Sequence, residues 1–164
     1  MGKIKNVIII STFLVILLLP IYSLAAPVNA DNEVVFSEEV LCGNYLYETI
    51  IVRNDLNDLS DDRGMNQNAT YTKTTYAKDS LGNNLWSVSI TGSFYYNGST
   101  VYCTGCSHQT AIYNNSWSII SSGSNYSGNA ATATATAQKK FLGSIIDQQT
   151  LNVTLICNPD GTAY

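Results

Sequence analysis

The sequence predicts an all-β protein, an antiparallel β-sandwich that follows an acidic N-terminal arm. Two observations carry this prediction. Apolar and polar side chains alternate along residues 85–96, and Gly- and Asn-rich turn signals recur between short segments of high β-propensity. In addition, Ser, Thr and Asn together occupy about a third of residues 31–164. This composition is unlike that of a helical bundle, which is rich in Ala, Leu, Glu and Lys.

The clearest strand covers residues 85–96. Its odd-numbered positions from Ser87 to Ser93 are small and polar, which predicts one buried face and one solvated face. Asn97-Gly98 directly after it is a strong hairpin signal, and residues 82–84 form a turn before it. The residues expected on the buried face are Trp86, Val88, Ile90, Gly92, Phe94 and Tyr96.

The remaining strands are expected at residues 45–53, 70–78, 100–104, 113–121, 129–141 and 150–158. In the fifth of these, Ala alternates with Thr. Thr at every second position favours a strand with a thin inner face over a helix. Short strands at regular spacing indicate a sandwich or a small barrel, which we place at residues 69–164.

The N-terminal residues 1–30 are typical of a secretory signal peptide. Lys3 and Lys5 precede an apolar stretch that Pro20 interrupts, and Val28 and Ala30 provide the small residues of a cleavage site. The alternative is an uncleaved membrane anchor, because the apolar run is nearly as long as a spanning helix. We expect a secreted, extracellular protein that contacts a membrane only through this segment before cleavage.

Charge divides the rest of the chain. Residues 31–62 carry nine acids and one Arg, whereas residues 63–164 carry five basic residues and three acids. We expect residues 31–68 to form an acidic arm or an edge element of the sheet. The acidic segment 55–62 suggests a calcium loop, but Arg63 stands where an EF-hand requires Gly. The net negative charge excludes a nucleic-acid-binding protein, which needs a basic surface.

Four cysteines in an exported chain predict disulfides. Cys103 and Cys157 both fall on the apolar parity of their strands, so we expect them to pair across the sandwich. Cys42 would then pair with Cys106 and attach the arm to the sheet. The alternative is a local Cys103–Cys106 bridge with Cys42–Cys157.

The same Cys103-Thr104-Gly105-Cys106 segment matches the CxxC redox motif, which makes a disulfide-exchange enzyme an alternative function. That motif normally requires a helix N-terminus within a βαβ unit, which the pattern lacks. His108 follows two residues later, but a single CxxC with one His is weak support for zinc. We therefore expect His108 to be a solvated loop residue, and we predict neither a metal nor a cofactor.

The sequence predicts no enzyme, because it contains no nucleophile elbow, Walker, HExxH or dinucleotide-binding motif. Tyr95 and Tyr102 fall on the outward parity of adjacent strands. They form either a cross-strand pair that stabilises the sheet or a flat aromatic platform for a sugar ring.

Several segments resemble small secreted proteins of Gram-positive bacteria, over about half of the chain. The matching pieces are residues 74–79, 85–88, 92–99, 116–117, 127–130 and 154–157. The resemblance implies export and a β fold, and it implies no activity. The order Cys103, Trp117, Cys157 also resembles that of immunoglobulin domains, although Leu155 stands where those domains carry a tyrosine.

From these observations we expect an exported, non-catalytic protein of binding or surface-interaction type, whose partner is a glycan or another cell-surface component. A secreted antagonist of other cells is a further alternative, for which no residue argues.

Overall fold

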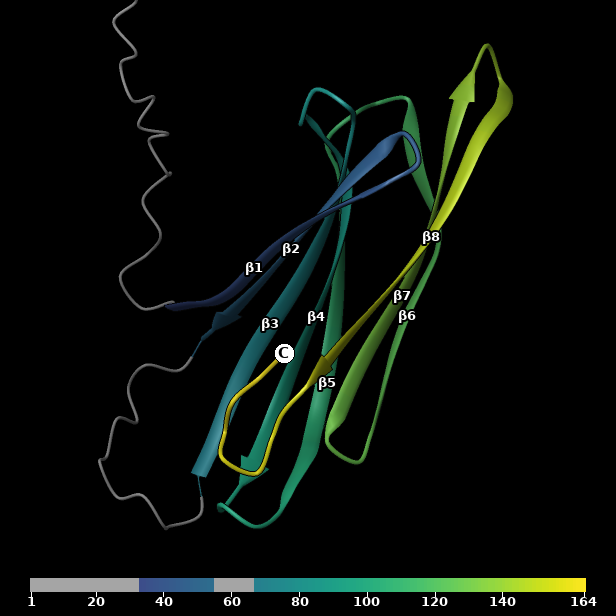
Figure 1. The fold of residues 1–164 in the computed structure, drawn as a ribbon. Coiled ribbons are helices and arrows are strands. Elements are labelled where there is room, and N and C mark those ends of the chain that lie inside the picture. Colours follow the sequence, from purple (N-terminus) through teal and green to yellow (C-terminus); the bar gives the residue numbers. More distant parts are fainter. Residues whose placement is uncertain (1–32, 55–66) are drawn as a thin grey trace, which may run out of the picture.

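The protein is an antiparallel β-sandwich in a computed structural model that describes residues 33–54 and 67–164 (Figure 1). These residues form eight strands and no helix. Strands β1 to β5 form one sheet and β6 to β8 form the other, each in sequence order. The strands are β1 (Glu33–Cys42), β2 (Tyr45–Arg53), β3 (Gln67–Lys78), β4 (Asn84–Tyr96), β5 (Val101–Ile112), β6 (Trp117–Ser127), β7 (Ala130–Phe141) and β8 (Ser144–Ile156). This architecture confirms the predicted fold class.

Each sheet is a simple meander of hairpins, since every strand pairs antiparallel with its neighbour in sequence. Immunoglobulin domains instead connect their strands as a Greek key. The order of Cys103, Trp117 and Cys157 therefore occurs here in a sandwich with a different connectivity. Because each sheet is a meander, successive turns lie at alternate ends of the sandwich.

The inner faces of the two sheets form the core. Trp86, Val88, Ile90 and Phe94 of β4 are fully buried, as the alternation predicts. Opposite them, the buried apolar side chains of β7 are all alanines, so the backbones of the two sheets approach closely. Gly92 shows how closely, because a Cβ atom at this position would lie 3.2 Å from the Cβ of Ala131 and 2.7 Å from the ring of Phe94.

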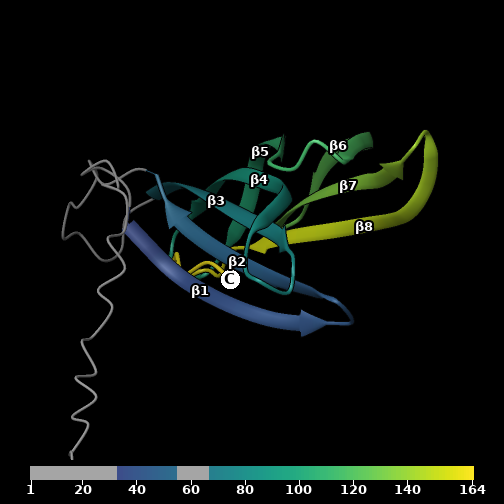
Figure 2. The ribbon, with the colours of Figure 1, turned by 90° about the horizontal axis from the view of Figure 1, so that it is seen from above.

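Polar contacts close both open sides of the sandwich. On one side β5 lies along β6 (Figure 2), and the Cys103 amide donates to the carbonyl of Gly128 at 2.7 Å. On the other side, the Tyr47 hydroxyl of β2 donates to Gln149 of β8 at 3.1 Å. Between the sheets, the Lys73 ammonium donates to the carbonyl of Thr154 at 2.9 Å, and burial lowers the pKa of this lysine.

The structure corrects the expected strands in two main places. Residues 33–42, for which no strand was expected, form β1, the edge strand that pairs with β2. Only β1 is an edge strand, since β2, which also lies in the predicted arm, pairs with β1 on one side and with β3 on the other. The strand expected at residues 100–104 runs on to Ile112, because a bulge at Thr104 lets β5 stay paired with β4.

Two further expectations concern the residues outside the described ranges. The signal peptide at residues 1–30 and the acidic segment 55–62 both lie there. Within residues 33–54 and 67–164, no helix of the length and hydropathy of a transmembrane span occurs.

Candidate functional site

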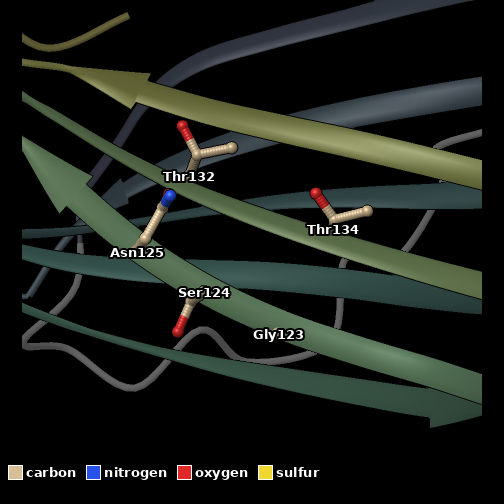
Figure 3. Close-up of a pocket in the computed structure, with 5 residues that line it drawn as sticks. All are labelled: Gly123, Ser124, Asn125, Thr132 and Thr134. Carbon is tan, nitrogen blue, oxygen red and sulfur yellow. The ribbon is translucent and has the colours of Figure 1, made fainter.

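A hollow of about 270 Å³ lies on the outer face of the three-stranded sheet (Figure 3). It is open to solvent and lies over β6 and β7. Gly123 leaves space between neighbouring side chains because it carries none of its own. The lining residues are Gly123, Ser124, Asn125, Thr132 and Thr134.

The Ala/Thr alternation of β7 builds this face. Its alanines point into the core, and Thr132, Thr134 and Thr136 therefore point outward. Each threonine lies opposite a polar residue of β8, and the pairs hydrogen-bond across the strands. Thr134 Oγ1 donates to Asn152 Oδ1 at 2.6 Å, Thr132 and Thr154 hydroxyls lie 3.1 Å apart, and Thr136 and Thr150 hydroxyls lie 2.9 Å apart.

This face carries no charge. From residue 117 to 138 and from residue 148 to 156 the sequence has no Asp, Glu, Lys or Arg. Neutral hydroxyl and amide groups can both donate and accept hydrogen bonds, so each pair keeps hydrogen-bonding capacity for a ligand after bonding to its neighbour. The arrangement can bind a neutral, hydroxyl-rich molecule. Sequence analysis missed it, although the alternation that produces it is visible in residues 130–137.

Tyr95 and Tyr102 lie together, as their parity predicts. Their rings stack with centroids 4.9 Å apart and an interplanar angle of 29°. Because the two rings face each other, each covers one face of the other; Tyr102 is half exposed and Tyr95 is partly buried. The pair lies on the outer face of the five-stranded sheet, away from the hollow of β6 and β7.

The four cysteines are thiols in the structure. Cys103 and Cys157 are buried at one end of the core, where their amides bind the adjacent carbonyls of Gly128 and Asn129 at 2.7 and 3.1 Å. Burial, with smaller contributions from Asp160 and Cys103, raises the pKa of Cys157 to about 11. Both thiols lie buried in the same core, and the Cys103–Cys157 bridge stays a prediction.

The expected Cys42–Cys106 bridge is wrong for a single chain of this fold. Cys42 lies in β1 and Cys106 in β5, the two opposite edges of the five-stranded sheet. Four strand spacings separate them, roughly 19 Å. A disulfide requires Cα atoms within about 7 Å. Cys42 is exposed beside the β1–β2 turn instead.

Cys106 lies on the same inner face of β5 as Cys103. The bulge adds one residue between them, so Cys103 pairs with Phe94 and Cys106 pairs with Gly92, two positions of equal parity on β4. This placement on one face is therefore also compatible with a local Cys103–Cys106 bridge. Burial raises the pKa of the Cys103 thiol, which opposes the reactivity that a redox CxxC needs.

His108 is not a solvated loop residue, which corrects that prediction. It is partly buried in β5, and its ring nitrogens contact two hydroxyls of β6, Nδ1 to Ser124 Oγ at 3.0 Å and Nε2 to Ser122 Oγ at 3.2 Å. These contacts join the two sheets along the β5–β6 side. Among the described residues, no three His, Cys, Asp or Glu side chains gather in a way that could hold a metal ion.

Comparisons of the chain with known protein families, with curated proteins and with solved structures find no match.

Proposed function

We propose that the chain is an exported, non-catalytic binding protein whose ligand is a neutral glycan, bound on the outer face of β6, β7 and β8. The observation that carries this proposal is the uncharged array of hydroxyl and amide pairs beside the hollow at Gly123. Sugars present closely spaced hydroxyls, which such groups bind by paired donation and acceptance.

The spacing of the array supports an extended ligand over a single small molecule. Successive outward residues of a strand lie about 6.8 Å apart, and neighbouring strands lie about 4.8 Å apart. The three threonine positions of β7 and their partners on β8 thus form a strip roughly 14 Å long. Such a strip offers hydrogen bonds to several consecutive sugar units.

A glycan array probed with the protein identifies the ligand class, and titration calorimetry then measures its affinity. Thr134→Val and Asn125→Ala each remove hydrogen-bonding groups from the hollow while keeping the strand. We expect each to weaken binding about fivefold, the equivalent of one hydrogen bond. The matched control is Thr74→Val, which removes one member of a similar hydroxyl pair, with Ser89, on the other sheet.

Two results would overturn the proposal. One is a protein that binds none of the glycans on the array. The other is a glycan whose affinity is unchanged by both hollow variants. If Tyr102→Ala then abolishes that binding, the site is the Tyr95–Tyr102 platform instead.

Disulfide exchange remains the alternative function, and the same-face placement of Cys103 and Cys106 favours it. Thiol titration of the native protein separates the two. A fast-reacting Cys103–Cys106 pair with disulfide-exchange activity would support the enzyme. If these two sulfurs are instead unreactive or held in a stable bridge, the result would support the binding protein.

A further inference from the structure

The chain path places the four odd-to-even connections, three hairpin turns and the crossover from β5 to β6, at one end of the sandwich, the upper end in Figure 1. These are the turns β1–β2, β3–β4, β5–β6 and β7–β8, and they define what we call the apolar end. The large apolar side chains with the greatest exposure among the described residues all lie there: Leu142 (90%), Leu81 (85%), Leu41 (70%) and Phe141 (63%). Ile112, Tyr113, Ile145 and Ile146 are also exposed at this end.

The opposite end provides an internal comparison. Its described turns are 97–100, 128–129 and 158–162, and they consist of Asn, Gly, Ser, Thr, Asp and Pro. Turns of globular proteins normally have that composition. Among the turns that the structure describes, the exposed leucines are thus confined to one end, and solubility alone would disfavour them there.

Leu142 is unfavourable in a second way. It is the one non-glycine residue with positive φ (49°) in the described parts of the chain, and Gly143 follows with φ 84°. A two-residue turn with two positive φ angles favours Asn-Gly. A leucine there is strained as well as exposed, and strain that persists without a structural reason points to a function of the side chain.

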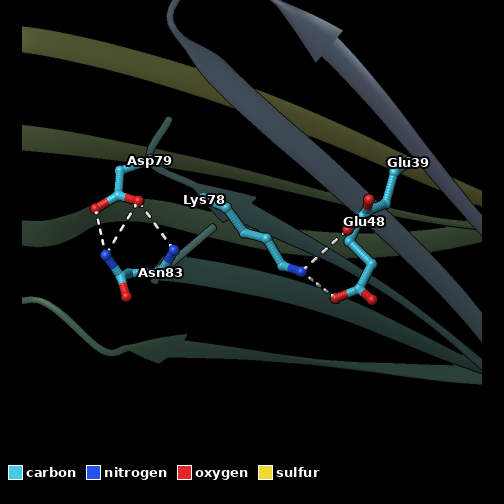
Figure 4. A network of polar contacts seen from close by, with 5 residues as sticks. All are labelled: Glu39, Glu48, Lys78, Asp79 and Asn83. Atoms are coloured by element: carbon cyan, nitrogen blue, oxygen red, sulfur yellow. Dashed lines mark hydrogen bonds and ion pairs between the residues drawn. The ribbon is translucent and has the colours of Figure 1, made fainter. Parts of the chain in front are cut away.

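The turn that carries Leu81 is held in a fixed shape. Asp79 Oδ1 accepts hydrogen bonds from the amides of Leu81 and Asn83, both at 2.9 Å, and Asp79 Oδ2 accepts one from the Asn83 side chain at 3.0 Å (Figure 4). These bonds hold the turn together from within. The leucine side chain is thereby presented to its surroundings on a turn of fixed shape.

The charges near the apolar end nearly balance, with three lysines against four carboxylates when Asp79 is included. The Lys78 ammonium pairs with Glu48 at 2.9 Å and with Glu39 at 3.2 Å (Figure 4). Lys139 lies opposite Asp147 in the β7–β8 ladder. Lys140 is exposed directly beside Phe141, and a lysine in that position can keep its ammonium in water while the neighbouring side chains enter an apolar phase.

We propose that the apolar end of the sandwich docks on a lipid bilayer, with Leu41, Leu81, Leu142 and Phe141 inserted to the level of the headgroup–acyl boundary. The apolar side chains stand on separate turns with polar residues between them. A fluid bilayer accommodates such separate projections, whereas a protein partner requires a contiguous complementary surface of about 800 Å². The inserted turns expose few free backbone groups, because each is closed by its own hairpin.

This proposal is independent of the glycan site, which lies on the outer face of one sheet. It also extends the sequence-based expectation, in which only the N-terminal segment contacts a membrane. Because the local charges nearly balance, we expect binding to depend little on anionic lipid or on salt.

Flotation of the protein with vesicles tests the proposal. Vesicles of phosphatidylcholine, alone and mixed with phosphatidylglycerol, are used with the chain as it is produced, and all variants share the same N-terminus. The triple variant L41S/L81S/L142N should bind about a thousandfold more weakly, since each leucine contributes about tenfold. The control V34S removes a half-exposed apolar side chain at the other end of β1 and should leave binding unchanged.

The triple variant should remain folded, because Asn at position 142 relieves the backbone strain and should not lower the melting temperature. A loss of flotation would then report on membrane binding and not on unfolding. Equal flotation of the wild type and the triple variant would overturn the proposal, as would a wild type that does not float with either vesicle. A wild type that sediments as a dimer, dissociates when the leucines are replaced and ignores vesicles would instead assign the apolar end to a second copy of the chain.

Discussion

The hydroxyl of Tyr45 donates a hydrogen bond to the carboxylate of Asp147, which lies 102 residues later in the chain. The contact joins β2 of one sheet to β8 of the other. Burial, with the hydrogen bond and charge of Asp147, raises the pKa of Tyr45 to about 12. Tyr47 beside it also has a raised pKa, mainly because of burial.

The raised pKa values predict loss of stability in alkali. A tyrosine whose folded pKa exceeds its unfolded value stabilises the fold below about pH 10, and this contribution declines as the pH rises toward 12. We therefore expect the free energy of unfolding to fall between pH 10 and 12, measured by urea denaturation. Tyr45→Phe should lower stability at pH 7 and make this fall shallower. An equally steep fall in the variant would show that other groups cause it.

Gly92→Ala should destabilise the protein by about 1–3 kcal/mol, the range for overpacking a core. The added methyl would meet the Phe94 ring and Ala131, where the thin alanine face of β7 lets the sheets approach. The matched control is Gly105→Ala on β5, where an added Cβ meets nothing within 4 Å. Thermal denaturation of both variants decides the point, and equal melting temperatures would mean that the sheets can separate without cost.

Leu142→Asn should stabilise the protein by about 1 kcal/mol, because Asn tolerates positive φ better than Leu does. Denaturant titration of the single variant measures the change. Leu142→Ala is the useful comparison, since it removes the exposed side chain but keeps the strained backbone and should give little gain. If Ala stabilises as much as Asn, exposure rather than backbone strain sets the cost of the leucine.

The thiols of the reduced protein should react with iodoacetamide in a fixed order. Cys42 is exposed and should be modified first, while Cys103 and Cys157 are buried and should react last. The pKa of Cys157, about 11, leaves almost no thiolate at neutral pH. Rapid labelling of Cys157 in the native protein would contradict the buried position.

In the oxidised protein, peptide mapping should recover Cys103 joined to Cys157. Closing this loop would stabilise the fold by about 4 kcal/mol. Replacing both residues with Ala should therefore lower the melting temperature, whereas Cys42→Ala should leave it nearly unchanged. Recovery of a Cys103–Cys106 peptide would show that the Thr104 bulge, which brings both residues to one face, selects the local bridge.

The sequence alone determined the fold class and most strands, because alternation with a period of two is a local property. The run from Trp86 to Tyr96 and the Ala/Thr repeat of β7 each specify a buried and a solvated face without reference to other strands. The Asn97-Gly98 turn and the stacked pair of Tyr95 and Tyr102 follow from the same local register.

Tertiary structure decided the rest. Residues 33–42 carry acids and apolar residues without alternation, and they form a strand only because β2 offers them an edge. Cys42 and Cys106 lie apart because of the order of strands in the sheet. The face on which Cys106 lies depends on one bulged residue. The spacing of the cysteines along the sequence encodes neither. Likewise, Leu41, Leu81 and Leu142 lie far from one another in the sequence. They share one end because a meander returns every second turn to the same side.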